Sequence, residues 1–139
     1  MEGSGDNREM EERARQVLLV EDEALVAMEL EDALRGNGWE VLGPASTLDE
    51  AHAMVAQGVA MDAAVVDINL QGRWVHSLAE ELRRRNVPFV VMSGYEVIDP
   101  DGRFEGMPVL TKPTSSREVC EALDTLASRP TPPAAGAMS

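Results

Sequence analysis

Val17-Leu18-Leu19-Val20-Glu21-Asp22-Glu23 is a short apolar run that stops abruptly at three acidic residues. A run of branched and aliphatic side chains without polar alternation is typical of a strand that is buried on both faces. The residues that follow have the helical period and end near two glycines, which predicts a helix over residues 24–36. The chain therefore opens its regular part with a buried strand and an amphipathic helix.

The same unit recurs along the chain, with four more apolar runs that each precede a helical pattern or a break in it. Strands alternating with helices predict a doubly wound α/β fold, a five-stranded parallel sheet with helices on both faces. Capping-box pairs, Thr47 with Glu50 and Ser115 with Glu118, mark two helix starts. The further predicted strands are residues 39–45, 63–66, 88–92 and 108–110, and the further helical stripes lie within residues 48–57, 75–82 and 115–126.

Residues 94–107 are unlike a regular helix, because Gly94, the run Asp99-Pro100-Asp101-Gly102 and Gly106 would interrupt it. We therefore expect the fourth helix to be irregular, either short, displaced or partly a loop. Outside the regular part, residues 1–14 are expected to be a flexible lead-in and residues 129–139, rich in proline and small residues, a disordered tail. This leaves one domain over residues 15–128, with no output domain at either end.

Composition excludes several classes of function. The net charge is −13, from 25 acidic against 12 basic residues, which argues against a nucleic-acid binder. No apolar stretch is long enough for a membrane helix, and the acidic N-terminus does not resemble a signal peptide. Cys120 is the only cysteine, so we expect no internal disulfide and a reducing, cytoplasmic location. His52 and His76 lack metal-ligand spacing and are expected to have structural or surface roles.

Polar residues follow the predicted strands at the point where each strand ends. Glu21 and Asp22 follow the first strand, Asp67 the third, Ser93 the fourth and Lys112 the fifth. The carboxyl ends of parallel strands meet at one sheet edge, so we expect these residues to converge. Crowded carboxylates favour Mg²⁺, and a carboxylate beside it can attack a phosphoryl group. Lys112 is the only lysine beside eleven arginines, and a compact point charge suits phosphoryl oxygens.

These motifs together resemble the receiver domain of two-component response regulators over roughly residues 16–128. They are the runs Val17–Glu23, Val65-Val66-Asp67-Ile68-Asn69, Met92-Ser93-Gly94 and Leu110-Thr111-Lys112-Pro113. The resemblance implies a flavodoxin-like fold with strand order 2-1-3-4-5. It also implies a regulator that is phosphorylated by a sensor histidine kinase or a histidine phosphotransfer protein. Such a domain is not an enzyme beyond catalysing its own phosphorylation and its slow dephosphorylation.

The resemblance assigns a role to each strand-end residue. Asp67 corresponds to the phosphoacceptor, and Glu21 and Asp22 to the acidic pair that holds Mg²⁺ or Mn²⁺ together with it. Asn69 stands where a backbone carbonyl completes the metal site. Ser93 and Lys112 match the hydroxyl and the lysine that contact the phosphoryl group, and Lys112 precedes a proline that is often cis in the family.

Two positions depart from the usual pattern. The family commonly has an aromatic switch residue three positions before the lysine, where this chain has Val109. The loop after Asp67, Asn69-Leu70-Gln71-Gly72, also lacks the common Met-Pro. Together with the segment Pro88–Tyr95, this loop resembles a subgroup of single-domain alphaproteobacterial receivers with a Phe-Ala-Thr-Gly-type motif, although Met92 and Ser93 stand where Ala and Thr would be. We hypothesise that Ser93, Tyr95 and the irregular segment 94–107 report phosphorylation instead of an aromatic residue at position 109.

Two other functions stay open from the sequence. An aspartyl-phosphate hydrolase uses the same nucleophile, but on its first strand and with a second aspartate two residues later, where this chain has Asn69. A pseudo-receiver that binds partners without phosphorylation is opposed by the intact set of Glu21, Asp22, Asp67 and Lys112, while Val109 leaves it open. With no output domain expected, the signal would pass by protein contact, from a monomer or a weak homodimer. The sequence identifies neither the kinase nor the target.

Overall fold

The computed structural model describes residues 15–70, 73–94 and 104–128 of the 139-residue chain. Five parallel strands form one sheet in the order β2-β1-β3-β6-β7, which confirms the predicted topology. The strands are β1 (Arg15–Val20), β2 (Trp39–Ala45), β3 (Ala63–Asp67), β6 (Phe89–Ser93) and β7 (Val109–Thr111). The helices are α2 (Ala24–Gly36), α3 (Leu48–Ala56), α4 (His76–Arg84) and α5 (Ser116–Ser128).

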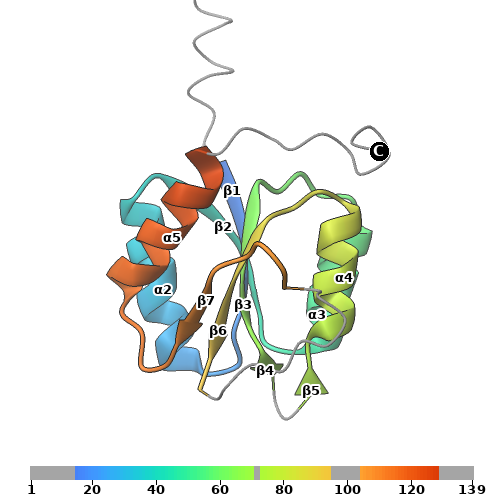
Figure 1. The fold of residues 1–139 in the computed structure, drawn as a ribbon, viewed down its shortest axis with the longest axis horizontal. Coiled ribbons are helices and arrows are strands. Elements are labelled where there is room, and N and C mark those ends of the chain that lie inside the picture. The colour runs from blue at the N-terminus through green and yellow to red at the C-terminus, as the bar shows by residue number, and fades with distance from the viewer. Residues whose placement is uncertain (1–14, 71–72, 95–103, 129–139) are drawn as a thin grey trace, which may run out of the picture.

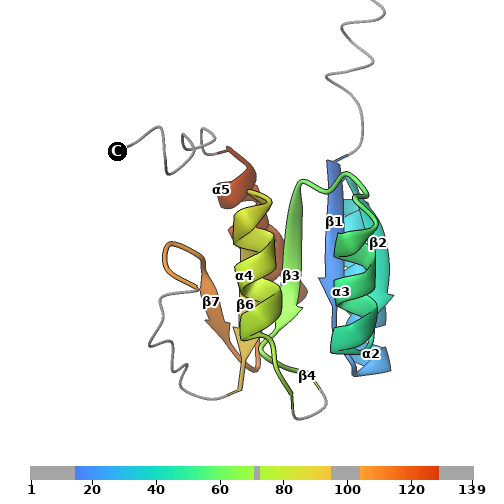
Figure 2. The same ribbon diagram turned by 90° about the vertical axis from the view of Figure 1, so that its right-hand side faces the viewer.

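Helices cover both faces of the sheet, α2 and α5 on one side and α3 and α4 on the other (Figures 1 and 2). The position of β1 between the two helical layers explains why its residues 17–20 are all apolar. Val17 and Leu19 belong to the core under α2 and α5, whereas Leu18 and Val20 belong to the core under α3 and α4. Successive side chains of a strand point to opposite faces, so a strand between two helical layers must be apolar at every position.

The two capping boxes begin helices as predicted. At α5, the Glu118 amide donates to Ser115 Oγ at 3.1 Å, and the Ser115 amide donates to Glu118 Oε1 at 2.9 Å. At α3, the Glu50 amide donates to Thr47 Oγ1 at 3.0 Å, while the Glu50 carboxylate accepts from the Ser46 amide at 2.8 Å. These bonds satisfy backbone groups that a helix leaves open at its start.

One element was not predicted. Between β3 and α4 the chain forms a two-stranded antiparallel sheet, β4 (Asn69–Leu70) with β5 (Arg73–Trp74). Its two strands are separated by two residues, Gln71 and Gly72, and two residues are the commonest length of a hairpin connection. After β6, the expected irregular helix falls mostly on residues 95–103, which lie outside the described residues. Residues 104–107 form a turn.

Both histidines take structural positions. His52 joins α3 to α4, with Nδ1 3.1 Å from Glu81 Oε1 and Nε2 3.1 Å from Ser77 Oγ. His76, the first residue of α4, stacks on the ring of Phe104. Cys120 is buried on α5, where desolvation raises the pKa of its thiol. No helix in the described part of the chain is long and apolar enough to cross a bilayer.

Candidate functional site

The predicted site residues meet at the carboxyl edge of the sheet, the lower edge in Figure 1. Asp67 and Ser93 are the last residues of β3 and β6, Glu21 directly follows β1, and Lys112 directly follows β7. The chain leaves β1 toward β2 on one side of the sheet and returns to β3 on the other. Strands β1 and β3 therefore flank the point where an open α/β sheet has its ligand crevice.

Three carboxylates converge there. Oxygen atoms of Glu21, Asp22 and Asp67 all lie within 4.8 Å of one another. Glu21 is 1% exposed and Asp67 5% exposed, while Asp22 is half-buried. Like charges held this close and this dry repel one another, so the arrangement needs cationic charge to be stable in its ionised form.

Lys112 supplies part of that charge. Its Nζ lies 3.0 Å from Oδ2 of Asp67. Partial burial of Lys112 opposes its ionisation, but the hydrogen bond to Asp67 and the charges of Asp67 and Glu21 outweigh burial, so the pKa of Lys112 is raised. The backbone also holds the lysine in place, because the Lys112 amide donates to the Ser93 carbonyl at 2.7 Å. The following Lys112–Pro113 peptide bond is cis.

Glu21 is the most perturbed acid of the cluster. Burial, followed by repulsion from Asp67 and Asp22, raises the pKa of its carboxyl to about 7, although the Glu23 amide donates to Glu21 Oε2 at 3.0 Å and Lys112 lies nearby. Its other oxygen, Oε1, is buried and has no hydrogen-bond partner among the described residues. A buried carboxylate oxygen without a donor is costly unless a cation binds it.

These features fit a divalent cation of the magnesium type. The available ligands are oxygen atoms only, which Mg²⁺ and Mn²⁺ prefer, and few carboxylates suffice because Mg²⁺ keeps several waters. The orphaned Oε1 of Glu21 is an independent sign that a positive ligand belongs there. Asn69 lies two residues beyond Asp67 in β4, and the role of its carbonyl stays a prediction.

The predicted switch positions have different outcomes. Ser93 is 1% exposed at the end of β6, beside the backbone of Lys112. Val109 is 39% exposed on β7, so the position that is aromatic in most of the family carries a small, partly exposed side chain. Tyr95 lies outside the described residues. Phe104 was not among the predicted site residues, and it is buried at 4% exposure. The available signal was a single aromatic residue in a segment rich in glycine and aspartate.

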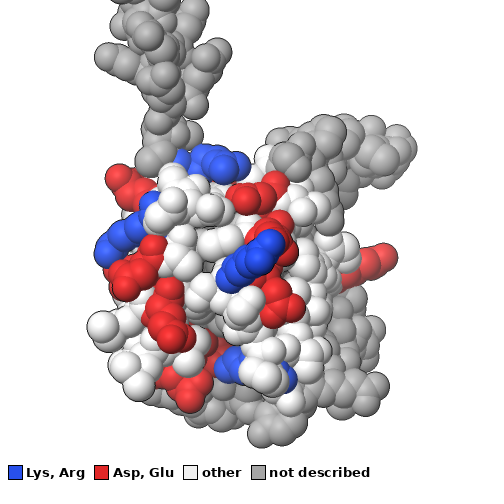
Figure 3. Space-filling model, turned by 90° about the vertical axis from the view of Figure 1, so that its left-hand side faces the viewer, with Lys and Arg blue, Asp and Glu red and all other residues white. Residues whose placement is uncertain are grey.

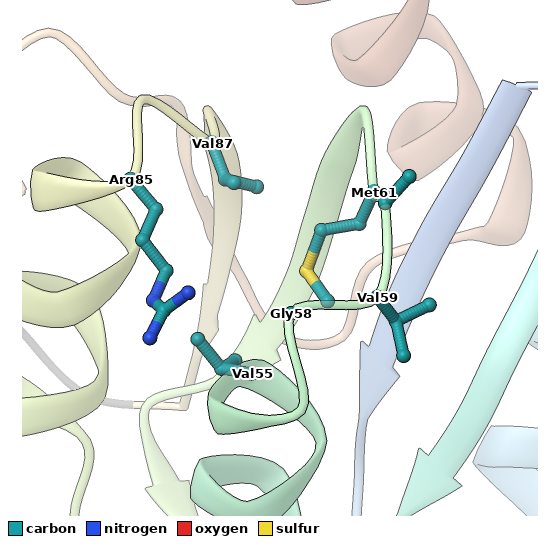
Figure 4. A pocket seen from close by; sticks show the side chains of 7 residues that line it. Val55, Gly58, Val59, Met61, Arg85 and Val87 are labelled. Carbon is teal, nitrogen blue, oxygen red and sulfur yellow. The ribbon is translucent and has the colours of Figure 1, made fainter.

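A hollow of about 220 Å³ lies at the opposite edge of the sheet (Figure 4). Apolar residues line it, together with Arg85 at the end of α4, and they are Val55, Gly58, Val59, Ala60, Met61 and Val87. The residues before β3 and β6 contribute to it, whereas the carboxylates follow β1 and β3. The hollow is therefore separate from the carboxylate cluster and contains none of its residues.

Comparison with known proteins agrees with this geometry. A transcriptional regulatory protein of Mycobacterium tuberculosis, PdtaR, is 31% identical over 119 residues, which cover 83% of this chain and 58% of that protein. The chain thus spans little more than half of that relative. The solution structure of SdrG from Sphingomonas melonis Fr1 is 40% identical, with a TM-score of 0.68, over 81% of this chain and 95% of that one.

A receiver protein from Sinorhizobium medicae is 27% identical, with a TM-score of 0.74, over 83% of this chain and 95% of that one. Residues 17–124 match the response regulator receiver domain. Receiver domains interact with histidine kinases or phosphotransfer proteins and bind Mg²⁺ through acidic residues. With the strand order and the strand-end cluster in agreement, the chain belongs to the response regulator receiver domain family.

Proposed function

We propose that this protein is a phosphoacceptor of two-component or phosphorelay signalling, with Asp67 as the residue that carries the phosphoryl group. One observation carries the proposal: the Asp67 carboxylate is almost buried, lies 3.0 Å from the only lysine of the chain and shares a cluster with Glu21 and Asp22. An aspartate that merely capped a turn would need neither the lysine nor the two other acids.

The transfer is a displacement at phosphorus. A carboxylate oxygen of Asp67 forms the new bond to phosphorus, the nitrogen–phosphorus bond of a phosphohistidine breaks, and the leaving imidazole keeps the electron pair and takes a proton. Lys112, whose Nζ lies 3.0 Å from Asp67, would stabilise the oxygens on which negative charge accumulates, and a fixed charge of this kind lowers the barrier of such reactions. Ser93, at the end of the neighbouring strand, would donate a hydrogen bond to the phosphoryl group.

The reaction is proposed to depend on Mg²⁺ or Mn²⁺. Glu21, Asp22 and Asp67 would hold the cation, with the Asn69 carbonyl as a further ligand. Such an ion neutralises phosphoryl oxygens during transfer. The raised pKa of Glu21 favours a protonated carboxyl in the absence of a cation, and Glu21 would release this proton when it binds the metal.

The phosphohistidine donor is proposed to dock over the start of α2. Leu25 and Met28 are 77% and 59% exposed, lie one helical turn apart and follow the acidic pair within a few residues. An exposed apolar pair beside a buried acceptor suits a protein partner. The state of Asp67 is then passed on by contact with a further protein.

Labelling with acetyl phosphate tests the acceptor. We expect phosphorylation of the full chain in the presence of Mg²⁺ and none after chelation with EDTA. Asp67→Asn should abolish it, whereas the control Asp32→Asn, an exposed acid on α2, should label like the wild type. Absence of labelling would favour the pseudo-receiver, and rapid turnover of many phosphate esters would favour the hydrolase.

A second experiment separates docking from chemistry. Leu25→Ala combined with Met28→Ala is expected to slow transfer from a phosphorylated kinase, found by profiling the kinases of the host, about tenfold, an effect of the size typical for truncated interface anchors. Labelling by acetyl phosphate should stay unchanged, because a small donor needs no docking surface. Val59→Ala, at an exposed valine near the opposite sheet edge, is the control. Equal transfer by all three proteins would contradict this docking site.

A further inference from the structure

The turn formed by residues 104–107 is fastened to α4 by side chains. The ring of Phe104 stacks on that of His76 with 4.9 Å between the centroids and 28° between the planes. Arg83, near the other end of α4, donates from Nη1 to the carbonyl of Glu105 at 2.7 Å. Phe104 also meets Phe89 of β6 edge to face, at 6.2 Å. The turn therefore cannot move without changing its contacts with α4.

A short series of contacts joins this turn to the acceptor strand. Ile68, the residue after Asp67, donates from its amide to the Met92 carbonyl at 2.9 Å and accepts from the Val75 amide at 3.2 Å. Val75 directly precedes His76, the first residue of α4. Ile68, Val75, Phe89 and Phe104 belong to one buried core cluster. A displacement at Ile68 thus has two routes to Phe104, through His76 and through the core.

The position where the family has its aromatic switch cannot serve in the same way here. Val109 is 39% exposed on the edge strand β7 and has no ring that could move between a buried and an exposed place. Phe104 is the aromatic side chain of the described residues after β6, and it is 4% exposed. Well-packed cores respond to a local shift by moving between discrete arrangements, since they contain few voids to absorb it.

We propose that the stacked pair of Phe104 and His76 reports the state of Asp67 to the surface made by the 104–107 turn and α4, in place of an aromatic residue at position 109. The proposal rests on phosphorylation of Asp67. In the phosphorylated state the ends of β3 and β6 adjust around the new group, Ile68 and Val75 follow, and the stack rearranges together with the Arg83–Glu105 contact. A protein that binds this surface then distinguishes the two states.

Nuclear magnetic resonance of the full chain tests the proposal, with Mg²⁺ and beryllofluoride as a mimic of the phosphoryl group. In the wild type, we expect the amide of Ile68, the ring of His76 and the amides of Glu105 and Gly106 to shift with a common midpoint. His76→Ala and Phe104→Leu should keep the shift at Ile68 and lose the shifts at Glu105 and Gly106. His76→Phe, which restores a stacking ring, should recover them, and Val109→Ala should behave like the wild type.

The outcomes separate this inference from the acceptor itself. No shift at Ile68 in the wild type would overturn both the acceptor role of Asp67 and the reporter. A shift at Ile68 with wild-type shifts at Glu105 and Gly106 in His76→Ala and Phe104→Leu would overturn the reporter alone. Loss of those shifts in Val109→Ala would likewise overturn it, because position 109 would then carry the signal. If Phe104→Leu fails to fold, His76→Ala and His76→Phe decide.

Discussion

Glu21 and Asp67 are two acidic side chains that the fold keeps almost out of water, 1% and 5% exposed, within one small cluster. Each depends on its surroundings in a different way. Asp67 has the ammonium group of Lys112 at 3.0 Å, whereas the Glu23 amide donates to one oxygen of Glu21 and leaves the other without a donor among the described residues, and the pKa of Glu21 is raised to about 7. The energetic cost of the site is therefore concentrated at Glu21 and is relieved by protonation or by a cation.

Lys112→Ala removes the nearest cation from the carboxylate cluster. We expect the fold to remain and the rate of labelling by acetyl phosphate to fall by about 100-fold, the size of effect seen when a charge-stabilising group is removed. The pKa of Glu21 should rise further, since Lys112 lowers it. Lys112→Arg is the control for charge alone, and we expect it to recover only part of the rate because its rigid fork differs in shape. Wild-type labelling by Lys112→Ala would contradict the role of the lysine.

Glu21 predicts an unusual dependence of stability on pH in the absence of divalent cations. Its carboxyl has a pKa of about 7 in the folded chain and 4.5 as an ordinary glutamate, so between these values the folded state binds a proton that the unfolded state has released. The contribution of Glu21 is therefore most favourable below pH 4.5 and is lost as the pH rises through 7. The difference amounts to at most about 3 kcal/mol.

Urea unfolding in EDTA from pH 5 to pH 8 measures this effect. Glu21→Gln keeps the shape without the charge, so the variant should gain stability relative to the wild type as the pH rises. Other carboxyl groups, such as Glu118, have a lowered pKa and give the opposite trend, which the comparison of the two proteins cancels. A difference between wild type and variant that does not change with pH would show that Glu21 titrates normally.

The start of a helix is defined by local capping bonds, whereas the end of a strand is defined by its pairing in the sheet. The reciprocal bonds between Ser115 and Glu118 define where α5 begins, and α5 begins directly after the loop that carries Lys112. The capping bonds therefore define where the loop that carries Lys112 ends.

Ser115→Ala removes the side-chain acceptor at the start of α5. The expected loss is about 1 kcal/mol in the free energy of unfolding, the usual value for an N-cap serine. Ser116→Ala, one residue into the helix, is the matched control and should change stability by less than about 0.5 kcal/mol. Equal losses in the two variants, measured by urea unfolding, would mean that the cap does not stabilise α5.

Elements were predictable where one residue pattern had one structural solution. The run from Val17 to Val20 could only be a strand buried on both faces, and the capping boxes located helix starts to within a residue. The β4–β5 hairpin was missed because two-residue strands are too short to show alternation, so that only Gly72 gave a signal.

The same reasoning explains what could be foreseen of the site. Its members were predictable because parallel strands bring their carboxyl ends together, whatever the details of packing. Glu21 and Asp22 were predicted to belong to the site, but the deeper burial of Glu21 was not, because burial depends on packing between elements that are distant in the sequence. Phe104 was overlooked for a similar reason, because its burial depends on His76 and Phe89, which are far away in the sequence.

The whole molecule carries a net charge of −13, and acidic side chains outnumber basic ones over the face formed by α2 and α5 (Figure 3). Some of these acids are paired, as Glu31 is with Arg35 and Glu121 with Arg117, but the pairs are partly exposed and contribute little. Most of the excess charge is repulsive at long range and lies outside the cluster of Glu21, Asp22 and Asp67.

Repulsion of this kind predicts a stabilising effect of salt. Raising KCl from about 10 mM to about 150 mM shortens the screening length from roughly 30 Å to 8 Å and should raise the free energy of unfolding. The measurement is urea unfolding at pH 8 in EDTA, where divalent cations do not contribute. A fall in stability with salt would show that attractive ion pairs, rather than net repulsion, dominate the surface.

Chemical trapping of the phosphorylated chain shows directly whether Asp67 is the acceptor. Borohydride reduces an aspartyl phosphate to homoserine, so peptide mass mapping after treatment with acetyl phosphate and Mg²⁺ identifies the acceptor. We expect homoserine at position 67 and at no other acidic residue, and we expect no homoserine after chelation of Mg²⁺. Homoserine at Asp22 or at another acidic residue, or none at all in a folded and metal-loaded protein, would contradict it.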